Sequence, residues 1–362
     1  MRQSRKVIMR ILCVLGVLAS GLTAAATSAG AAVPNRWGFA YVDVPNGVPN
    51  LAHQAGSWPP GPTVSVLTPV GGPTYVRFPQ LAVAGGVVHV TAVSPSPRWC
   101  QVLKWGPSGP DLLVAVRCYQ YGGAPVTVPF TVLFEESTGL LPAPKAFGYV
   151  HYNGAAIATQ FNSAGVANTV VAGPPGVWTV SLPGLGSAGR AGGLQVTAVN
   201  PTQPARCKVA AWASAPAGQT VRVRCHNATN IPLNTGWTLT YQRERAITGA
   251  ALPPKNFAYT FDNTPANAGP YSPVPPAVNY NSQGALNTVQ SAGVGLRLVT
   301  FPQVGVLPDH VQVTAYGPGP EYCNLLTLWF TGALTATVRD VACYNGLVRA
   351  NRPSLTTYTS AF

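Results

Sequence analysis

The 362-residue chain contains three copies of one sequence module, and this repetition limits the folds open to it more than any other feature. The segment VHVTAV at 88–93 returns as LQVTAV at 194–199 and as VQVTAY at 311–316. Before it, each copy has an aromatic segment and a proline segment: WGFAYVDVPN, AFGYVHYN and NFAYTFDN, then YVRFPQL, WTVSLPGL and LVTFPQV. After it come a cysteine-to-tryptophan segment (CQVLKW, CKVAAW, CNLLTLW) and a VRC or VAC segment.

The spacing of the copies is that of whole domains. Thr91, Thr197 and Thr314 are 106 and 117 residues apart, a length that can enclose its own hydrophobic core. Two linkers of similar sequence, at 137–147 and 247–257, separate the copies, and their prolines favour extended chain. We therefore expect a first module at 32–138, a second at 139–249 and a third at 250–362.

Each copy has the sequence pattern of an all-β domain. Apolar residues occupy alternate positions in the VHVTAV segments and in TVRVRC at 220–225, as in strands that bury one face. Clusters of Gly, Pro, Asn and Ser break such runs at intervals of about 8–12 residues, a spacing typical of sandwiches and barrels. The pattern predicts three tandem antiparallel β-sandwiches of about seven or eight strands each. Jelly-roll wiring is one option, and the pattern leaves the strand order open.

Six of the seven cysteines predict one hairpin disulfide in each module. The pairs Cys100–Cys118, Cys207–Cys225 and Cys323–Cys343 have separations of 18, 18 and 20, with turn-like sequence midway in each pair. Folding each segment about that turn places its two cysteines opposite one another. Closing such a loop stabilises a module by roughly 3 kcal/mol. Zinc is the alternative, but two thiols do not complete a zinc site. His226 is replaced by tyrosine in the other copies, so we expect no metal.

The N-terminal segment predicts export. Four basic residues precede an apolar run at 11–22 and a small-residue stretch with two A-x-A sites, which is the layout of a signal peptide. The apolar run is too short to span a membrane. We expect a signal peptide at 1–31, cleavage after Ala31, and a secreted, extracellular protein without a membrane span.

Charge after the signal peptide is basic but thinly spread. The 18 Lys and Arg beyond residue 31 face nine Asp and Glu and form no dense basic run, so we expect no nucleic-acid partner. Arg222 and Arg224 share one face of a predicted strand. They predict either a small anion-facing stripe or an ordinary solvated face.

Known catalytic motifs are missing, and the ionisable residues do not recur between copies. The sequence contains no G-x-S-x-G, G-x-G-x-x-G, G-x-x-x-x-G-K, H-E-x-x-H or EF-hand loop. We interpret Glu135 and Glu136 as surface residues, and Asp43 and Asp262 as solvated strand ends. The sequence therefore predicts no enzyme, no catalytic residues and no cofactor.

Aromatic residues do recur, and most of them are expected in the cores. The recurring sets are Phe39, Phe147 and Phe257, then Tyr41, Tyr149 and Tyr259, then Trp105, Trp212 and Trp329. Other tryptophans recur less regularly, and we expect them to be exposed contacts, for sugar rings among others: Trp37, Trp58, Trp178 and Trp237. The asparagines of FNSAGVANTV at 161–170 and YNSQGALNTV at 280–289 are expected to form turns.

The set of F-x-Y, YNSxGxxNTV, FPxL, VQVTAY, CxVxxW and VRC motifs resembles a group of exported tandem-repeat proteins of actinobacteria and myxobacteria. The resemblance covers nearly all of the chain after the signal peptide. It implies export and modular β architecture, and it carries over no site.

Export, triplication and the lack of catalytic motifs predict a secreted, non-catalytic protein. We expect it to bind cell-surface, cell-wall or other extracellular polysaccharide, or to act structurally outside the cell. Linked weak sites gain avidity without new contacts, which is a physical reason for triplication. The alternative is a secreted hydrolase or a protease inhibitor.

Overall fold

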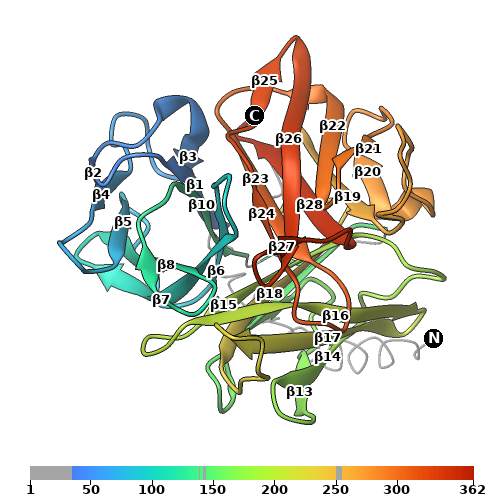
Figure 1. Cartoon of the computed structure of the whole chain (residues 1–362), viewed down its shortest axis with the longest axis horizontal. Coiled ribbons are helices and arrows are strands. Elements are labelled where there is room, and N and C mark those ends of the chain that lie inside the picture. Colours follow the sequence, from blue (N-terminus) through green and yellow to red (C-terminus); the bar gives the residue numbers. More distant parts are fainter. Residues whose placement is uncertain (1–34, 138, 142–143, 250–254) are drawn as a thin grey trace, which may run out of the picture. The chain divides into compact units, whose positions relative to one another are not determined.

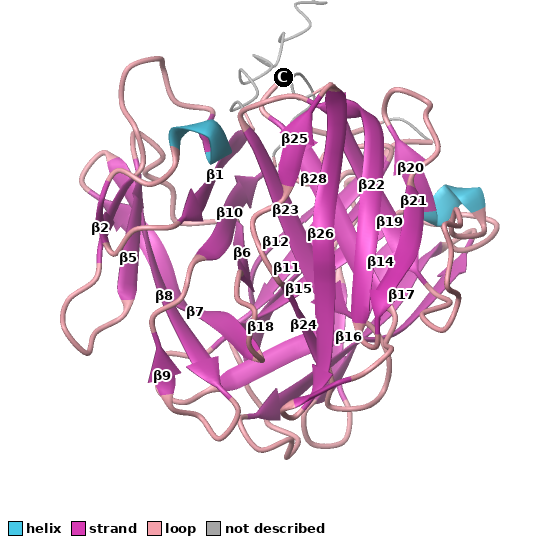
Figure 2. Ribbon diagram, turned by 45° about the horizontal axis from the view of Figure 1, so that its top comes forward, coloured by secondary structure: helices cyan, strands magenta, loops and turns pink. Residues whose placement is uncertain are grey.

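The computed structural model describes residues 35–137, 139–141, 144–249 and 255–362. The predicted signal peptide at 1–31 lies outside the described residues. Pro34–Phe362 form one compact unit, so the three modules are packed together. Regular structure in the described residues is almost entirely β-strand, with only two short 3-10 helices, η1 (Leu51–His53) and η2 (Pro276–Val278) (Figure 2).

Each module is a sandwich of two β-sheets, which confirms the predicted fold class. In module 1 the first sheet has the order β3 (Gln54–Gly56), β1 (Arg36–Val42), β10 (Phe130–Glu136), β6 (Val87–Ala92). Its second sheet has the order β2 (Asn46–Gly47), β4 (Ser65–Leu67), β5 (Thr74–Phe78), β8 (Asp111–Gln120), β7 (Arg98–Ser108), and β9 (Pro125–Val126) pairs with β8.

Modules 2 and 3 repeat this arrangement. In module 2 the first sheet is β12 (Ile157–Asn162), β11 (Ala146–Tyr152), β18 (Gly236–Arg243), β15 (Gly193–Val199), and the second is β13 (Thr169–Ala172), β14 (Val177–Pro183), β17 (Gly218–Asn227), β16 (Ala205–Ala215). In module 3 the first sheet is β20 (Asn279–Asn281), β19 (Phe257–Asp262), β28 (Ser354–Ser360), β23 (Asp309–Ala315). The second is β21 (Thr288–Gly293), β22 (Leu296–Gly305), β26 (Leu334–Asn345), β24 (Tyr322–Leu325), and β25 (Phe330–Gly332) and β27 (Val348–Arg349) pair with β26.

In modules 2 and 3 the chain crosses between the two sheets four times, and in module 1 the short strand β2 adds two further crossings. The strands that carry the VTAV or VTAY sequence, here called the VTAV strands, are β6, β15 and β23. In each module the last strand lies between the first strand and the VTAV strand, so both ends of a module meet in its first sheet. Because successive side chains of a strand point to opposite faces, the valines of the VTAV strands enter the sandwich interiors. Val90, Val196 and Val313, at one repeat position, belong to three separate hydrophobic clusters, one inside each sandwich.

The predicted hairpin disulfides are confirmed. Cys100 lies directly opposite Cys118 in the β7–β8 pair, and the same register joins the cysteines of β16–β17 and of β24–β26. The bonds are Cys100–Cys118, Cys207–Cys225 and Cys323–Cys343. Three disulfides in one chain are typical of folding in an oxidising compartment.

The three modules form a closed ring with pseudo-threefold symmetry. One parallel β-bridge joins each pair of neighbours: Val199 to Val102, Tyr316 to Val209, and Val93 to Leu325. In every bridge one partner ends a VTAV segment and the other stands two residues after the first cysteine of a hairpin. Each module therefore contacts the next through the same two surfaces, which is how head-to-tail interfaces close. Figure 1 shows β6, β15 and β24 converging near the middle of this unit.

A second contact repeats around the ring, one residue before each bridge. Gln101 donates from Nε2 to the carbonyl of Asn200 at 2.6 Å and accepts from the amide of Ala205 at 2.6 Å. Asn324 makes the equivalent contact with the carbonyl of Ser96 in module 1, at 2.9 Å. Module 2 has Lys208 at this position, and its Nζ instead forms an ion pair with Glu321 of module 3 at 2.9 Å.

The first sheets meet at the centre of the ring through buried polar side chains. The His89 ring of module 1 contacts Thr197 at 3.2 Å through Nδ1 and Thr240 at 2.8 Å through Nε2, both in module 2. Burial lowers the pKa of His89 to about 3, so the ring is neutral at physiological pH. Thr240 in turn donates to Glu135 of module 1. The threonines of the VTAV strands thus join modules rather than face water.

Candidate functional site

Two carboxylates that the sequence placed at the surface are buried, so both of those interpretations were wrong. Glu135 is fully buried because β10 of module 1 packs against module 2. Asp262 is 1% exposed because Arg297 covers it, with Nε 2.8 Å from Oδ2. Asp43, by contrast, is exposed, as expected.

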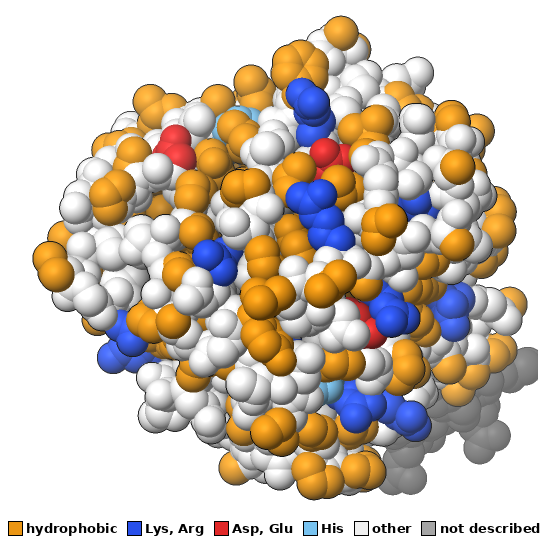
Figure 3. Space-filling model, in the orientation of Figure 1, with side chains coloured by type: hydrophobic (Ala, Val, Ile, Leu, Met, Phe, Trp, Pro, Cys, Tyr) orange, Lys and Arg blue, Asp and Glu red, His pale blue; other side chains and the backbone are white. Residues whose placement is uncertain are grey.

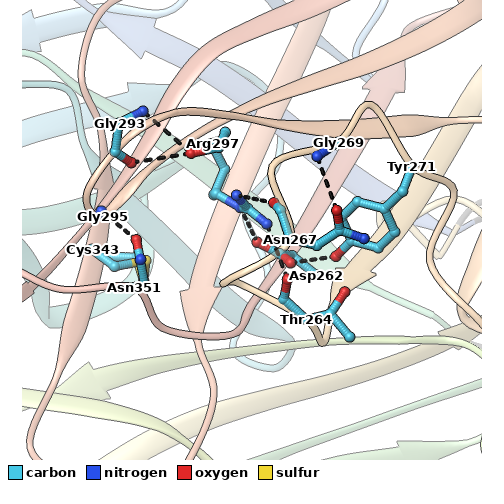
Figure 4. A network of polar contacts seen from close by, with 12 residues as sticks. Asp262, Thr264, Asn267, Gly269, Tyr271, Gly293, Gly295, Arg297, Cys343 and Asn351 are labelled. Atoms are coloured by element: carbon cyan, nitrogen blue, oxygen red, sulfur yellow. Dashed lines mark hydrogen bonds and ion pairs between the residues drawn. A yellow bond between two sulfur atoms is a disulfide. The ribbon is translucent and has the colours of Figure 1, made fainter.

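The Asp262 carboxylate is fully engaged within module 3 (Figure 4). Tyr271 donates its hydroxyl to Oδ1 at 2.5 Å, while Arg297 also donates to the carbonyls of Asn267 and Thr264. Figure 4 shows these side chains converging on the loop that follows β19. Both carboxylate oxygens have partners, so the network clamps a loop and leaves no free acid for chemistry.

A third buried carboxylate, Asp309, is hydrogen-bonded to a histidine ring, the pairing that a catalytic triad uses. Asp309 of module 3 accepts from His53 Nδ1 at 2.6 Å, and also from Trp329 Nε1 at 2.9 Å and Tyr358 at 3.0 Å. A hydrolytic triad would need a nucleophile on the other ring nitrogen of His53. Among the described residues, no Ser, Thr or Cys side chain makes a hydrogen bond to this ring. The pair therefore joins modules 1 and 3 through a charge-assisted contact.

The tryptophans predicted to be exposed contacts are mostly core residues, so that prediction was wrong. Trp37, Trp178 and Trp237 are 6%, 3% and 0% exposed. Trp178 and Trp237 pack with Tyr152 inside the module 2 sandwich. Trp58 is half-buried against Phe78. At the repeat position of Trp237 the other two copies bury Phe130 and Leu355, so different side chains fill the same place in the three cores.

The turn role predicted for the asparagines is confirmed for Asn162 and Asn281, whose Oδ1 atoms accept from amides two residues later, both at 2.9 Å. Asn168 and Asn287 instead donate to carbonyls of neighbouring strands. Asn162 donates to Asn168 Oδ1 at 2.8 Å and to the Pro183 carbonyl at 2.9 Å. Asn281 makes the matching bonds to Asn287 and to the Pro302 carbonyl, at 2.9 and 2.8 Å. These side chains hold backbone and are not free for a ligand.

The predicted stripe of Arg222 and Arg224 lies in a groove on the outer sheet of module 2. The groove has a volume of about 530 Å³, which is within the usual range for small-ligand sites. Its walls are apolar and proline-rich, from module 2 and from the β23–β24 connection of module 3: Pro174, Pro175, Val177, Ala210, Pro232 and Pro318. Thr179 and the two arginines supply its polar side chains.

The two arginines differ in how firmly they are held. Arg224 is half-buried and donates from Nη1 to the Pro318 carbonyl at 2.6 Å, while its buried Nε has no partner. Arg222 is exposed and makes neither a hydrogen bond nor an ion pair with the described residues. The groove therefore offers one positioned and one free guanidinium beside an apolar wall. Guanidinium groups bind carboxylate and phosphate oxygens in a bidentate manner.

Module 1 has a smaller groove at the equivalent place. It has a volume of about 130 Å³ and is lined by Pro69, Gly71 and Pro125 among others. Arg117, the repeat equivalent of Arg224, lines it and donates to the Gly71 carbonyl at 2.9 Å. Ala115 stands where module 2 has Arg222, so this groove lacks the free guanidinium.

The surface of the described residues as a whole carries a net positive charge. Thirteen of the 18 Lys and Arg in the described residues are not buried, against five of nine Asp and Glu. Nearly half of the carboxylates are buried, so the solvent-accessible surface carries an excess of positive charge. Figure 3 shows Lys and Arg scattered over one face, with Asp and Glu visible in few places.

No family model, curated protein or solved structure matches the chain in comparisons with known proteins. Within the described residues, no cluster of three or more His, Cys, Asp or Glu could hold a metal ion. In the same part of the chain, no helix is long and apolar enough to cross a membrane.

Proposed function

We propose that the protein is a secreted, non-catalytic protein that binds an acidic extracellular polysaccharide through the Arg222–Arg224 groove of module 2. The observation that carries the proposal is the exposed, unpaired Arg222 beside Arg224 in an apolar groove of about 530 Å³. A uronate carboxylate would pair with a guanidinium, while the carbon-bound hydrogens of the sugar ring would lie against the prolines.

The net positive surface supports the acidic class of polymer over a neutral one. Thirteen unburied cations against five unburied carboxylates attract an anionic polymer over a range of about one Debye length, 8–10 Å at physiological salt. The smaller groove of module 1 adds a second weak contact on the same compact unit. A long polymer that reaches both grooves would gain avidity.

The test measures binding of polygalacturonate, with neutral dextran of similar length as the comparison polymer. We expect binding of polygalacturonate that weakens from 50 to 300 mM NaCl, and no measurable binding of dextran. The double variant Arg222→Gln/Arg224→Gln should bind at least about 10-fold more weakly, because each lost charge-assisted contact contributes about 1.5–3 kcal/mol.

The matched control removes two exposed cations elsewhere, as Arg339→Gln/Arg349→Gln on β26 and β27. The control variant should lose only as much polygalacturonate binding as the removal of any two positive charges from the surface would cause. Equal weakening in both double variants would overturn the groove as the binding site. Binding of dextran as strong as that of polygalacturonate would overturn the acidic class.

A further inference from the structure

A cavity lies on the pseudo-threefold axis, between the VTAV strands of the three first sheets and the three disulfides. Residues at the same repeat positions of all three modules line it, among them the threonines Thr91, Thr197 and Thr314. One cysteine of each disulfide lines it as well. Its volume is about 40 Å³, enough for a few waters or one monatomic ion.

Three side chains at one repeat position meet beside this cavity. Trp99, Arg206 and Tyr322 each precede the first cysteine of their module, and all three line the cavity. The Arg206 guanidinium carbon lies 4.9 Å from the Trp99 ring centroid and 4.8 Å from that of Tyr322. The only cation of the three is thus held between its own repeat equivalents by cation–π contacts.

The charge of Arg206 is buried and incompletely compensated. The residue is 6% exposed, and its Nε and Nη1 atoms have no hydrogen-bond partner. Only Nη2 has one, the side chain of Asn230. Arg206 takes part in no ion pair with the described residues. A buried charge without a counter-ion is costly, so the two unpartnered atoms mark a place where an anion would be stabilised.

The neighbouring charges favour an anion as well. Lys208 lines the same cavity, and its one carboxylate, Glu321, is already held by Lys208 at 2.9 Å and Arg352 at 3.0 Å. His226 lines it as well, as a neutral ring. Burial lowers the pKa of Lys208 to about 8 and that of Arg206 to about 10, and burial together with these cations lowers that of His226 to about 3. The local positive charge exceeds the negative charge.

We propose that the axial cavity binds one small inorganic anion of halide size, held by the unpartnered guanidinium atoms of Arg206. The anion would supply the counter-charge that the protein itself does not supply, at the point where the three modules meet. Its binding would therefore stabilise the closed ring. This site is separate from the groove of module 2 and does not depend on polysaccharide binding.

The test compares thermal unfolding of the purified protein in sodium chloride and in sodium isethionate at equal ionic strength, because isethionate is too large for the cavity. We expect chloride to raise Tm by about 2–4 °C at ten to a hundred times its Kd. The Arg206→Gln variant should lose this chloride-specific rise. The Arg339→Gln variant, which removes an exposed cation on β26 outside both proposed sites, should keep it.

A measurement on the unaltered protein covers the case in which Arg206→Gln does not fold. Crystals grown in sodium bromide should show an anomalous peak in the axial cavity. Equal Tm values in chloride and isethionate would overturn the proposal. A bromide-grown crystal without a peak in the cavity would do so too, since water alone would then fill it.

Discussion

Trp237 offers the sharpest test of the sandwich cores, because the sequence suggested an exposed sugar contact at this position. Its side chain is 0% exposed, and its ring stacks on Tyr152 with centroids 5.3 Å apart. Trp178 completes a cluster of three rings, 6.1 Å from Trp237 and 5.8 Å from Tyr152. Its indole Nε1 is buried without a hydrogen-bond partner. The residue thus gives large apolar burial at the cost of one unsatisfied donor.

Two substitutions separate these contributions. Trp237→Ala should cost about 3–5 kcal/mol, as large-to-small changes in cores do. Trp237→Phe loses part of the ring, at about 1–2 kcal/mol, but it also removes an orphan N–H whose burial costs about 1–3 kcal/mol. The two effects nearly cancel, so Trp237→Phe should stay within about 1 kcal/mol of the wild type.

Calorimetry converts these energies into melting temperatures. An unfolding entropy of about 2.1 cal/mol/K per residue gives about 0.7 kcal/mol/K for a cooperative unit of this size, Pro34–Phe362. Trp237→Ala should therefore lower Tm by about 4–7 °C, and Trp237→Phe should change it by less than about 2 °C. Val171→Ala, at a 64% exposed position of the same module, serves as the surface control. A Trp237→Ala variant that melts with the wild type but no longer binds polygalacturonate would refute the core assignment.

The remaining predictions concern the hairpins, the ring and the asparagine contacts. Replacing Cys207 and Cys225 together by serine should cost about 3 kcal/mol in denaturant unfolding under non-reducing conditions, and a cost below 1 kcal/mol would contradict the loop-closure argument. Burial raises the pKa of Glu135 well above its ordinary value of 4.5, so its contribution to stability is full below that pH and falls as pH rises. The Tm of Glu135→Gln, measured relative to that of the wild type, should therefore rise from pH 4 to pH 8. A fall in this relative Tm would show that Glu135 is ionised in the folded protein. Asn168→Ala should cost about 1–3 kcal/mol, since Asn168 donates to the Tyr149 and Phe161 carbonyls, and chemical denaturation of the variant measures it.

Features with a local signature were predictable from the sequence. Valine alternates with threonine in the VTAV segments because neighbouring side chains of a strand point to opposite faces, so the strands could be located. The cysteines flank a turn at nearly equal distances, so their pairing followed from the hairpin. The first asparagine of each NSxGxxNTV segment, Asn162 or Asn281, showed its turn role through residue type and spacing alone.

Burial between modules had no such signature. Thr240 and Glu135 have the residue types of a solvated strand face, yet they contact each other across two modules. Nothing in the sequence around Asp262 indicates that its partner is Arg297, which lies 35 positions further along the chain. The irregular recurrence of Trp237 suggested exposure, whereas it reflects a core filled differently in each copy.

The sequence by itself determined the three modules, their β-strands and their disulfides, because periodicity, spacing and turn residues act over a few positions of the chain. Only the tertiary structure decided that the modules close into a ring, through bridges such as Val102 to Val199. It also decided which charges the ring buries, as at Arg206, and which it leaves free, as at Arg222. Contacts between modules join residues from about a hundred to more than two hundred positions apart, and no local pattern encodes which surfaces will meet.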